Sequence, residues 1–196
     1  MARNTILYTV SFSFILTFSI AMVLSAAHNA TQPRVIDGIR AHRQGAVLRA
    51  MGNDAVTREE IFEAYAELVS PRPGVYVDLE SETGRVATVF SGPGVWGEIS
   101  GVVGIQVDEM RVISVEILDH RETPGLGGRV ADPRFLDQFK GEQIGPDGIH
   151  VVLRGPGNDD PDDQTVDGIT GASGTTRAFD RIINTYLADT AWTEDL

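Results

Sequence analysis

The sequence contains no cysteine among its 196 residues. Disulfides, thiolate-bound metals and cysteine-ligated iron–sulfur clusters are therefore excluded. Lysine is nearly absent too, because Lys140 is the only one and the permanently cationic side chains are otherwise arginines. The formal net charge of −12 would repel nucleic-acid phosphates, so we expect no nucleic-acid partner.

The densest acidic stretch, residues 158–163, reads NDDPDD. It lacks the spaced ligands, the central glycine and the closing glutamate of a calcium-binding EF-hand loop. We interpret it as an exposed acidic loop and expect no metal site. A weak cation site is the alternative.

The N-terminal region has no charged side chain between Arg3 and His28. As a helix, residues 5–27 would span about 34 Å, which exceeds the roughly 30 Å of a bilayer core. We therefore expect a stub (residues 1–4) and a transmembrane helix (residues 5–27). A signal peptide cleaved near Ser25-Ala26-Ala27 is the competing interpretation.

Residues 28–74 have the pattern of a helical connector. Val47, Leu48 and Met51 would share one face of a first helix. Thr57 and Glu60 form a capping-box pattern that predicts a second helix over residues 58–69. The Ser-Pro-Arg-Pro-Gly run over residues 70–74 would end it.

From Val75 the hydrophobic period changes to two, which indicates strands. Strands are expected at Val75–Leu79, Arg85–Phe90, Ile99–Val107, Val112–Leu118 and His150–Leu153, with a hairpin turn at residues 108–111. Helices are expected at Pro133–Phe139 and Thr176–Ala188. This order predicts one α+β domain over residues 75–190, with a mixed or antiparallel sheet, and a tail over residues 191–196.

The run DGITGASGTTR, residues 167–177, leads into the last expected helix. Its small residues allow a close backbone approach, and a helix N-terminus suits a phosphate. Arg177 would add a charge partner. On the local pattern alone, a glycine-rich turn with Thr175 or Thr176 as N-cap is an equal alternative. A Walker loop is excluded because no lysine follows Gly174.

A second motif, Glu122-Thr-Pro-Gly-Leu-Gly127, follows an expected strand. Pro124 fixes φ, and the glycines permit positive φ and expose backbone N–H groups. Such a loop can present donors to the polar edge of a flat aromatic ring while Leu126 covers its face. The alternative is an ordinary turn.

The segment Gly92-Pro-Gly-Val-Trp-Gly97 fits the dinucleotide-binding pattern G-x-G-x-x-G. We reject that interpretation because the pattern must open a helix, whereas the following residues alternate like a strand. Trp96 would either stack on a ligand or pack in a core or interface, and we favour packing. His120, beside a carboxylate, is expected to make a structural hydrogen bond.

The first two motifs together resemble those of the FMN-binding subunits of sodium-pumping NADH:quinone oxidoreductase and the related Rnf complex. The resemblance implies a phosphoester bond between Thr175 and FMN, installed from FAD by a flavin transferase. Thr176 is the alternative attachment residue, and Ser173 stands where the family more often has threonine. The cofactor-binding residues implied are Asp167, Thr170, Gly171, Ala172, Ser173, Gly174, Thr175, Thr176, Glu122, Thr123, Pro124, Gly125, Leu126 and Gly127.

The Gly92–Gly97 and Ala41–Gly52 segments look like the sodium-pump branch of this family rather than the Rnf branch. The resemblance implies an electron-carrier subunit, with no catalytic residue of its own, among other membrane subunits of the complex. It also implies a bacterial inner-membrane protein with a periplasmic soluble domain, although Arg34, Arg40 and Arg43 do not support that orientation. The alternatives are an Rnf-type subunit, a stand-alone membrane-anchored FMN module and a purely structural domain.

Overall fold

The computed structural model describes residues 2–78, 81, 84–153 and 160–188, with side chains described from Ile6 onward. The chain divides into two compact units, Met1–Ala41 and His42–Leu196. Leu79, residues 158–159 of the acidic stretch and the expected tail over residues 191–196 lie outside the described residues.

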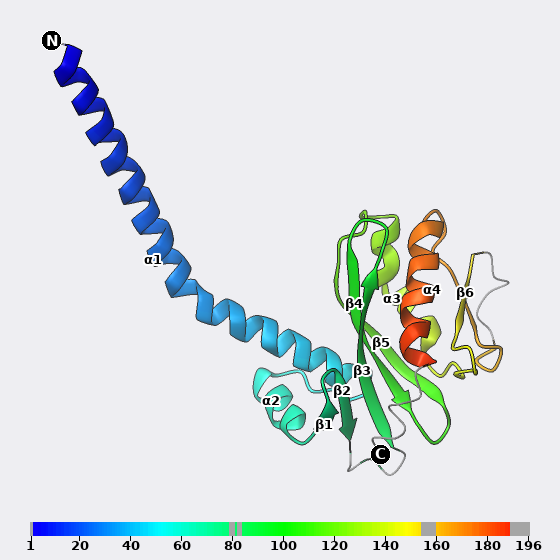
Figure 1. Ribbon diagram of the computed structural model, residues 1–196. Coiled ribbons are helices and arrows are strands. Elements are labelled where there is room, and N and C mark those ends of the chain that lie inside the picture. The colour runs from blue at the N-terminus through cyan, green and yellow to red at the C-terminus, as the bar shows by residue number, and fades with distance from the viewer. Residues whose placement is uncertain (1, 79–80, 82–83, 154–159, 189–196) are drawn as a thin grey trace. The chain divides into compact units, whose positions relative to one another are not determined.

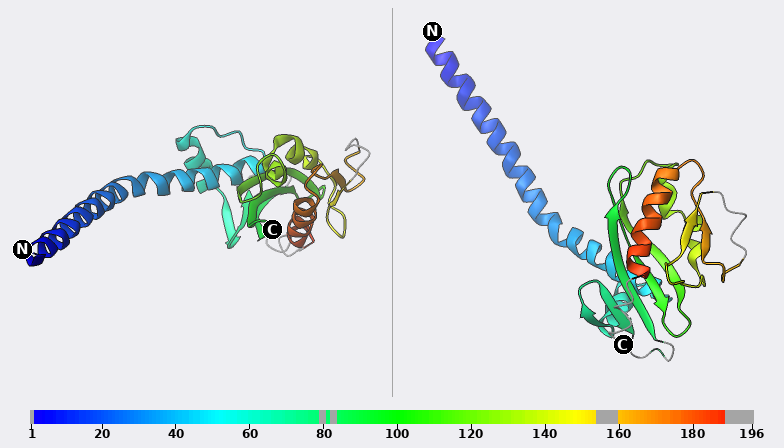
Figure 2. Two further views of the ribbon diagram at one scale, coloured as in Figure 1. Left: turned by 90° about the horizontal axis from the view of Figure 1, so that it is seen from above. Right: turned by 45° about the vertical axis from the view of Figure 1, so that its right-hand side comes forward.

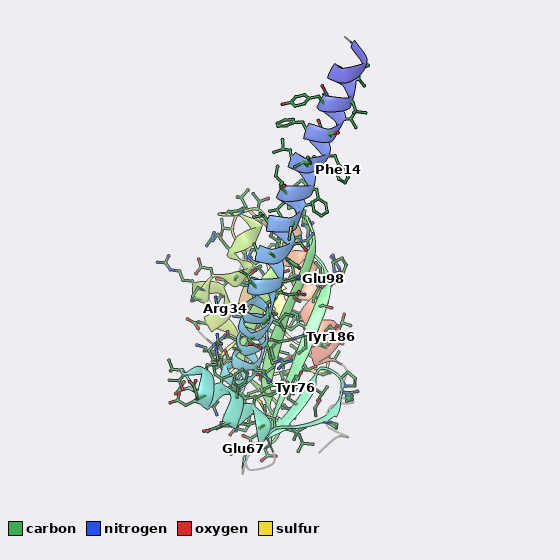
Figure 3. The ribbon with its side chains drawn as sticks, turned by 90° about the vertical axis from the view of Figure 1, so that its left-hand side faces the viewer. Phe14, Arg34, Glu67, Tyr76, Glu98 and Tyr186 are labelled. Atoms are coloured by element: carbon green, nitrogen blue, oxygen red, sulfur yellow. The ribbon has the colours of Figure 1, made fainter. Side chains whose placement is uncertain are left out.

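The N-terminal helix α1 runs without a break from Ala2 to Ala50 and contains Pro33. The expected transmembrane segment and the first part of the expected connector thus form one helix. Its apolar side chains in the first unit are exposed, and Figure 3 shows that of Phe14 projecting from the helix. The most apolar stretch has a mean hydropathy of 2.0, so by length and composition this helix can cross a membrane.

The second unit is built on a five-stranded antiparallel sheet in which neighbouring strands are consecutive in the chain (Figure 1). The strands are β1 (Val69–Arg72), β2 (Val75–Asp78), β3 (Arg85–Pro93), β4 (Glu98–Gln106) and β5 (Arg111–His120). A separate parallel pair consists of β6 (His150–Val152) and β7 (Thr165–Asp167). Each expected strand is present with ends that differ by at most three residues, so the α+β prediction is confirmed.

Both faces of the sheet are buried, as the alternation along β3 shows. Val86 and Phe90 belong to a large hydrophobic cluster, whereas the intervening Ala87 belongs to a smaller one. Successive side chains of a strand point to opposite faces, so the two clusters lie on opposite sides of the sheet.

Helix α4 (Ser173–Leu187) covers the face with the large cluster and runs along the strands (Figure 2). Its Phe179 packs edge-on against Phe90 of the sheet, with ring centroids 5.9 Å apart. Phe135 and Phe139 complete an aromatic group on the same face. These two residues lie on α3 (Pro133–Leu136) and η2 (Asp137–Phe139), which follow η1 (Gly127–Ala131).

The opposite face is covered by the C-terminal end of α1, where Ala46, Val47 and Ala50 are buried against Ala87 and Val102. The predicted apolar face of this helix is confirmed, because Leu48 and Met51 are buried as well. Helix α2 (Arg58–Ala66) lies next in the chain, and its capping box between Thr57 and Glu60 is present as predicted.

Several elements differ from the sequence-based expectation beyond these strand ends. Helix α2 ends at Ala66, and Val69 pairs with Val77 as part of strand β1 instead of extending the helix. Strand β7 was not expected. Helix α4 begins at Ser173, three residues before the predicted start.

Glu142 is a carboxylate buried in the second unit with no exposed surface. Burial, reinforced by Asp163, raises its pKa to about 7. The backbone N–H groups of Gln164 and Thr165 offset this in part, but within the described residues neither carboxylate oxygen accepts a hydrogen bond of good geometry. Glu142 is therefore neutral in mildly acidic solution and becomes a costly buried charge as the pH rises.

Glu142→Gln is expected to stabilise the domain at pH 8 and to have little effect at pH 5. The folded-state pKa lies above the ordinary value of 4.5, so the stability of the parent protein falls as the pH rises between 4.5 and about 7. A shift of this size corresponds to at most about 3 kcal/mol. Denaturant unfolding at both pH values measures the change in the free energy of unfolding, and the exposed Glu98→Gln is the control. An equal effect of Glu142→Gln at pH 5 and pH 8 would contradict the raised pKa of Glu142.

Candidate cofactor site at the start of helix α4

The two sequence motifs meet at a buried hydrogen bond between Thr175 and Glu122. The Thr175 hydroxyl donates to Oε2 of Glu122 over 2.6 Å, although 53 residues separate them in the chain. Each residue is only 4% exposed. A threonine hydroxyl paired with a buried carboxylate is an arrangement that neither motif predicts alone.

The second carboxylate oxygen of Glu122 is held by a third loop. Oε1 accepts hydrogen bonds from the backbone nitrogens of Val95 at 2.7 Å and Trp96 at 3.0 Å. The sequence singled out this loop as a family marker but did not place it in the site. The only available signal was its glycine content, since a side chain at Gly94 would meet Oε1 at 2.5 Å.

The pKa of Glu122 is lowered. Burial by itself would raise the pKa, but the hydrogen bonds from Thr175, Trp96 and Val95, together with the nearby His120, outweigh it. His120 also accepts a hydrogen bond from the Glu122 backbone nitrogen at its Nδ1, 3.3 Å away, which is the structural role expected of it. The carboxylate is therefore ionised at neutral pH.

Gly127 closes the site from the side of the Glu122–Gly127 loop. A Cβ atom there would overlap Oγ1 of Thr175 and lie 2.6 Å from Oε2 of Glu122. The loop is itself a tight turn, because the carbonyl oxygen of Thr123 accepts from the nitrogens of Leu126 and Gly128. Thr123, Pro124 and Gly125 complete this turn between strand β5 and η1.

The two loops that meet near helix α4 carry exposed apolar side chains. Val95 is 50% exposed, Trp96 71% and Leu126 49%. Val95 lies beside Gly174 and Leu126 lies beside Gly171, so both flank the start of helix α4. Trp96 does not pack in the core, because strand β3 ends at Pro93 and the following turn leaves the indole exposed. Packing at an interface, the other part of the expectation, stays a prediction.

Helix α4 begins without a side-chain cap among the described residues. Its N-cap position is Ala172, and Thr175 is the third residue of the first turn. The interpretation of Thr175 or Thr176 as N-cap is therefore wrong. Backbone N–H groups of an uncapped first turn, with the partial positive charge of the helix, favour a phosphate. Arg177, the expected charge partner, is exposed one turn onward.

Thr176 has a different role from that of its neighbour. Its hydroxyl accepts from the Ile169 nitrogen and donates to the Ala172 carbonyl oxygen, both at 3.1 Å. It has no exposed surface. Thr176 therefore holds the turn that precedes α4.

Several predicted residues line a cavity of about 420 Å³ on the approach to α4. They are Asp167, Thr170, Gly171 and Ser173, together with Gly168, Ile169 and Leu153. Thr175 and Glu122 are not among its lining residues, so the structure divides the predicted set between this cavity and the buried hydroxyl. Gly171, with a positive φ of 84°, lies beside Leu126 and connects the two parts.

These features fit a phosphorylated aromatic cofactor such as FMN. The first turn of α4 offers N–H groups for a phosphate, the Thr175 hydroxyl lies at that turn, and the exposed Val95, Trp96 and Leu126 offer apolar surface for a flat ring.

The family model described as the FMN-binding domain matches residues 94–188. The C subunit of the Na(+)-translocating NADH-quinone reductase of Yersinia pestis is 32% identical over 110 residues, 54% of this chain and 40% of the relative. The corresponding protein of Haemophilus ducreyi is 31% identical over 104 residues, 53% of this chain and 40% of the relative. The chain thus spans about two fifths of the length of these curated relatives.

Two crystal structures share the fold. Shewanella oneidensis NqrC aligns with a TM-score of 0.61 at 21% identity, covering 74% of this chain and 89% of that one. The C subunit of the Na(+)-translocating NADH-quinone reductase of Parabacteroides distasonis aligns with a TM-score of 0.63 at 21% identity, covering 82% and 93%.

Proposed function

We propose that this chain, whose residues 94–188 match the family model of the FMN-binding domain, carries FMN covalently on Thr175 and transfers electrons as a subunit of a membrane NADH:quinone oxidoreductase. The complex would couple electron transfer to sodium export. The similarity to C subunits of Na(+)-translocating NADH-quinone reductases supports this assignment over an Rnf-type subunit.

The observation that carries the proposal is the Thr175 hydroxyl in the first turn of α4, hydrogen-bonded to Glu122. An attachment residue needs a hydroxyl next to the phosphate-binding N–H groups, and Thr175 is so placed. Thr176 is one residue away, but both sides of its hydroxyl are engaged with backbone atoms inside the turn.

FMN supplies one- and two-electron transfer when bound, and the protein supplies its position and surroundings. The first turn of α4 would hold the phosphate. Leu126, Val95 and Trp96 would lie against the ring and exclude water from it. A covalent bond keeps the flavin on the subunit through every cycle. Electron transfer by this subunit then requires no general acid or base of its own.

The partners follow from the same assignment. Other membrane subunits would exchange electrons with the flavin, and a flavin transferase would install it from FAD. Helix α1 would anchor the chain in the bacterial inner membrane with a single pass, and the second unit would lie in the periplasm.

Thr175→Ala is expected to abolish covalent flavin, because no other hydroxyl replaces it at that position of the first turn. The full chain would be co-expressed with a flavin transferase, and intact-mass analysis after denaturation would score the added FMN. The control is Thr176→Val, which removes the neighbouring hydroxyl but keeps the branched shape and should remain modified.

Two results would refute the attachment site. Wild-type protein that remains unmodified beside an active transferase would refute covalent flavin. Modified Thr175→Ala protein together with unmodified Thr176→Val protein would move the bond to the neighbouring residue.

A further inference from the structure

We propose that Glu122 orients the Thr175 hydroxyl and accepts its proton when the flavin phosphate is attached. The inference rests on the proposed function. It assigns to a residue of this chain a step that activates the attachment site, in addition to whatever the transferase contributes.

The geometry supports this role for Glu122. The 2.6 Å separation of the two oxygens is typical of an O–H donor bound to an ionised carboxylate. The carboxylate cannot turn away, because its other oxygen is fixed by the Val95 and Trp96 nitrogens. Oε2 therefore stays directed at the hydroxyl.

The protonation state is suited to the role. The hydrogen bonds to Glu122 outweigh its burial and lower its pKa, so the side chain is ionised at neutral pH and Oε2 is a proton acceptor for the hydroxyl during the transfer. A threonine hydroxyl is a weak nucleophile by itself and becomes effective when a base adjoins it.

The step balances as a phosphoryl transfer without oxidation or reduction. The Thr175 oxygen forms a bond to the phosphorus of the FMN half of FAD. The bond from that phosphorus to the bridging oxygen breaks, and AMP leaves with the electron pair. The hydroxyl proton moves to Glu122, which also removes a negative charge that would otherwise face the attached phosphate.

Two substitutions separate proton acceptance from loop support. Glu122→Gln keeps an oxygen for the Val95 and Trp96 nitrogens but presents an NH₂ donor to Thr175 instead of an acceptor. Glu122→Asp keeps a carboxylate but shortens the side chain, so the loop contacts suffer more. The rate of attachment would be measured by intact mass on the purified full chain, with FAD and a flavin transferase, from pH 6 to about 9.

The expected order of rates at neutral pH is wild type, then Asp, then Gln, with Gln slower than wild type by about 100-fold or more. The residual rate of the Gln variant should rise with pH more steeply than that of the wild type. A Gln variant that is modified as fast as the Asp variant, or faster, would overturn the role of Glu122. An unmodified wild type or a modified Thr175→Ala variant would instead refute the proposed function itself.

Discussion

Gly127→Ala is expected to reduce covalent flavin attachment by about 100-fold or more, because a displacement of about 1 Å at a reacting group has an effect of that size. The added methyl would overlap the Thr175 oxygen and lie 2.6 Å from Oε2 of Glu122. The two side chains would have to separate, which breaks the hydrogen bond that directs the hydroxyl. The fraction of modified protein after co-expression with the transferase measures the effect.

The matched control is Gly141→Ala, outside both cofactor motifs. Gly141 has a positive φ of 78° and no atom of the described residues within 4 Å of its added methyl, so alanine there adds backbone strain without filling the site. That strain is of order 1 kcal/mol. Attachment in the Gly141 variant should stay near the wild-type level. Equal attachment in both variants would mean that the close approach of Gly127 to the Thr175 hydroxyl has no effect on flavin attachment.

Gly104→Ala is expected to destabilise the second unit strongly. The methyl would overlap the carbonyl group of Ala50 and lie 3.1 Å from the Met51 nitrogen. Backbone atoms cannot turn aside as a side chain can, so the end of α1 must move off the sheet. We expect a loss of about 3 kcal/mol or more. For a protein of this size that lowers the melting temperature by roughly 10 °C.

Near-UV circular dichroism of the full chain in detergent would follow this unfolding, because it reports the packing of the second unit. Gly38→Ala is the control, since Gly38 lies in α1 and no atom of the described residues comes within 4 Å of the added methyl. Alanine is the better helix former and should be neutral or slightly stabilising. An unchanged melting temperature for Gly104→Ala would show that α1 does not pack against β4 as described.

The strands and caps could be predicted because they depend on neighbouring residues. The alternation of apolar and polar residues predicted strands β2 to β6, and the capping-box pair Thr57 and Glu60 predicted the start of α2. Strand β1 was not predicted, because Pro71 has no N–H to donate to a sheet ladder and proline usually indicates the end of an element. It fits here because β1 is the edge strand of the sheet. Strand β7, with three residues, is too short to show a period.

The site could be predicted as a set of motifs but not as an arrangement. The family resemblance named Thr175 and Glu122 but not the bond between them, which spans 53 positions and leaves no periodic signal. The start of α4 was misplaced because hydroxyl residues before a helix usually indicate caps. Here Thr176 bonds to Ile169 and Ala172 instead, and the helix begins earlier.

The most direct test of covalent flavin at Thr175 is peptide mapping of the wild-type full chain after co-expression with a flavin transferase. Proteolysis followed by tandem mass spectrometry would locate the modified residue. We expect one flavin-bearing peptide with the FMN phosphate on Thr175. Flavin on any other residue, or a protein that is colourless after denaturation and washing, would contradict this assignment.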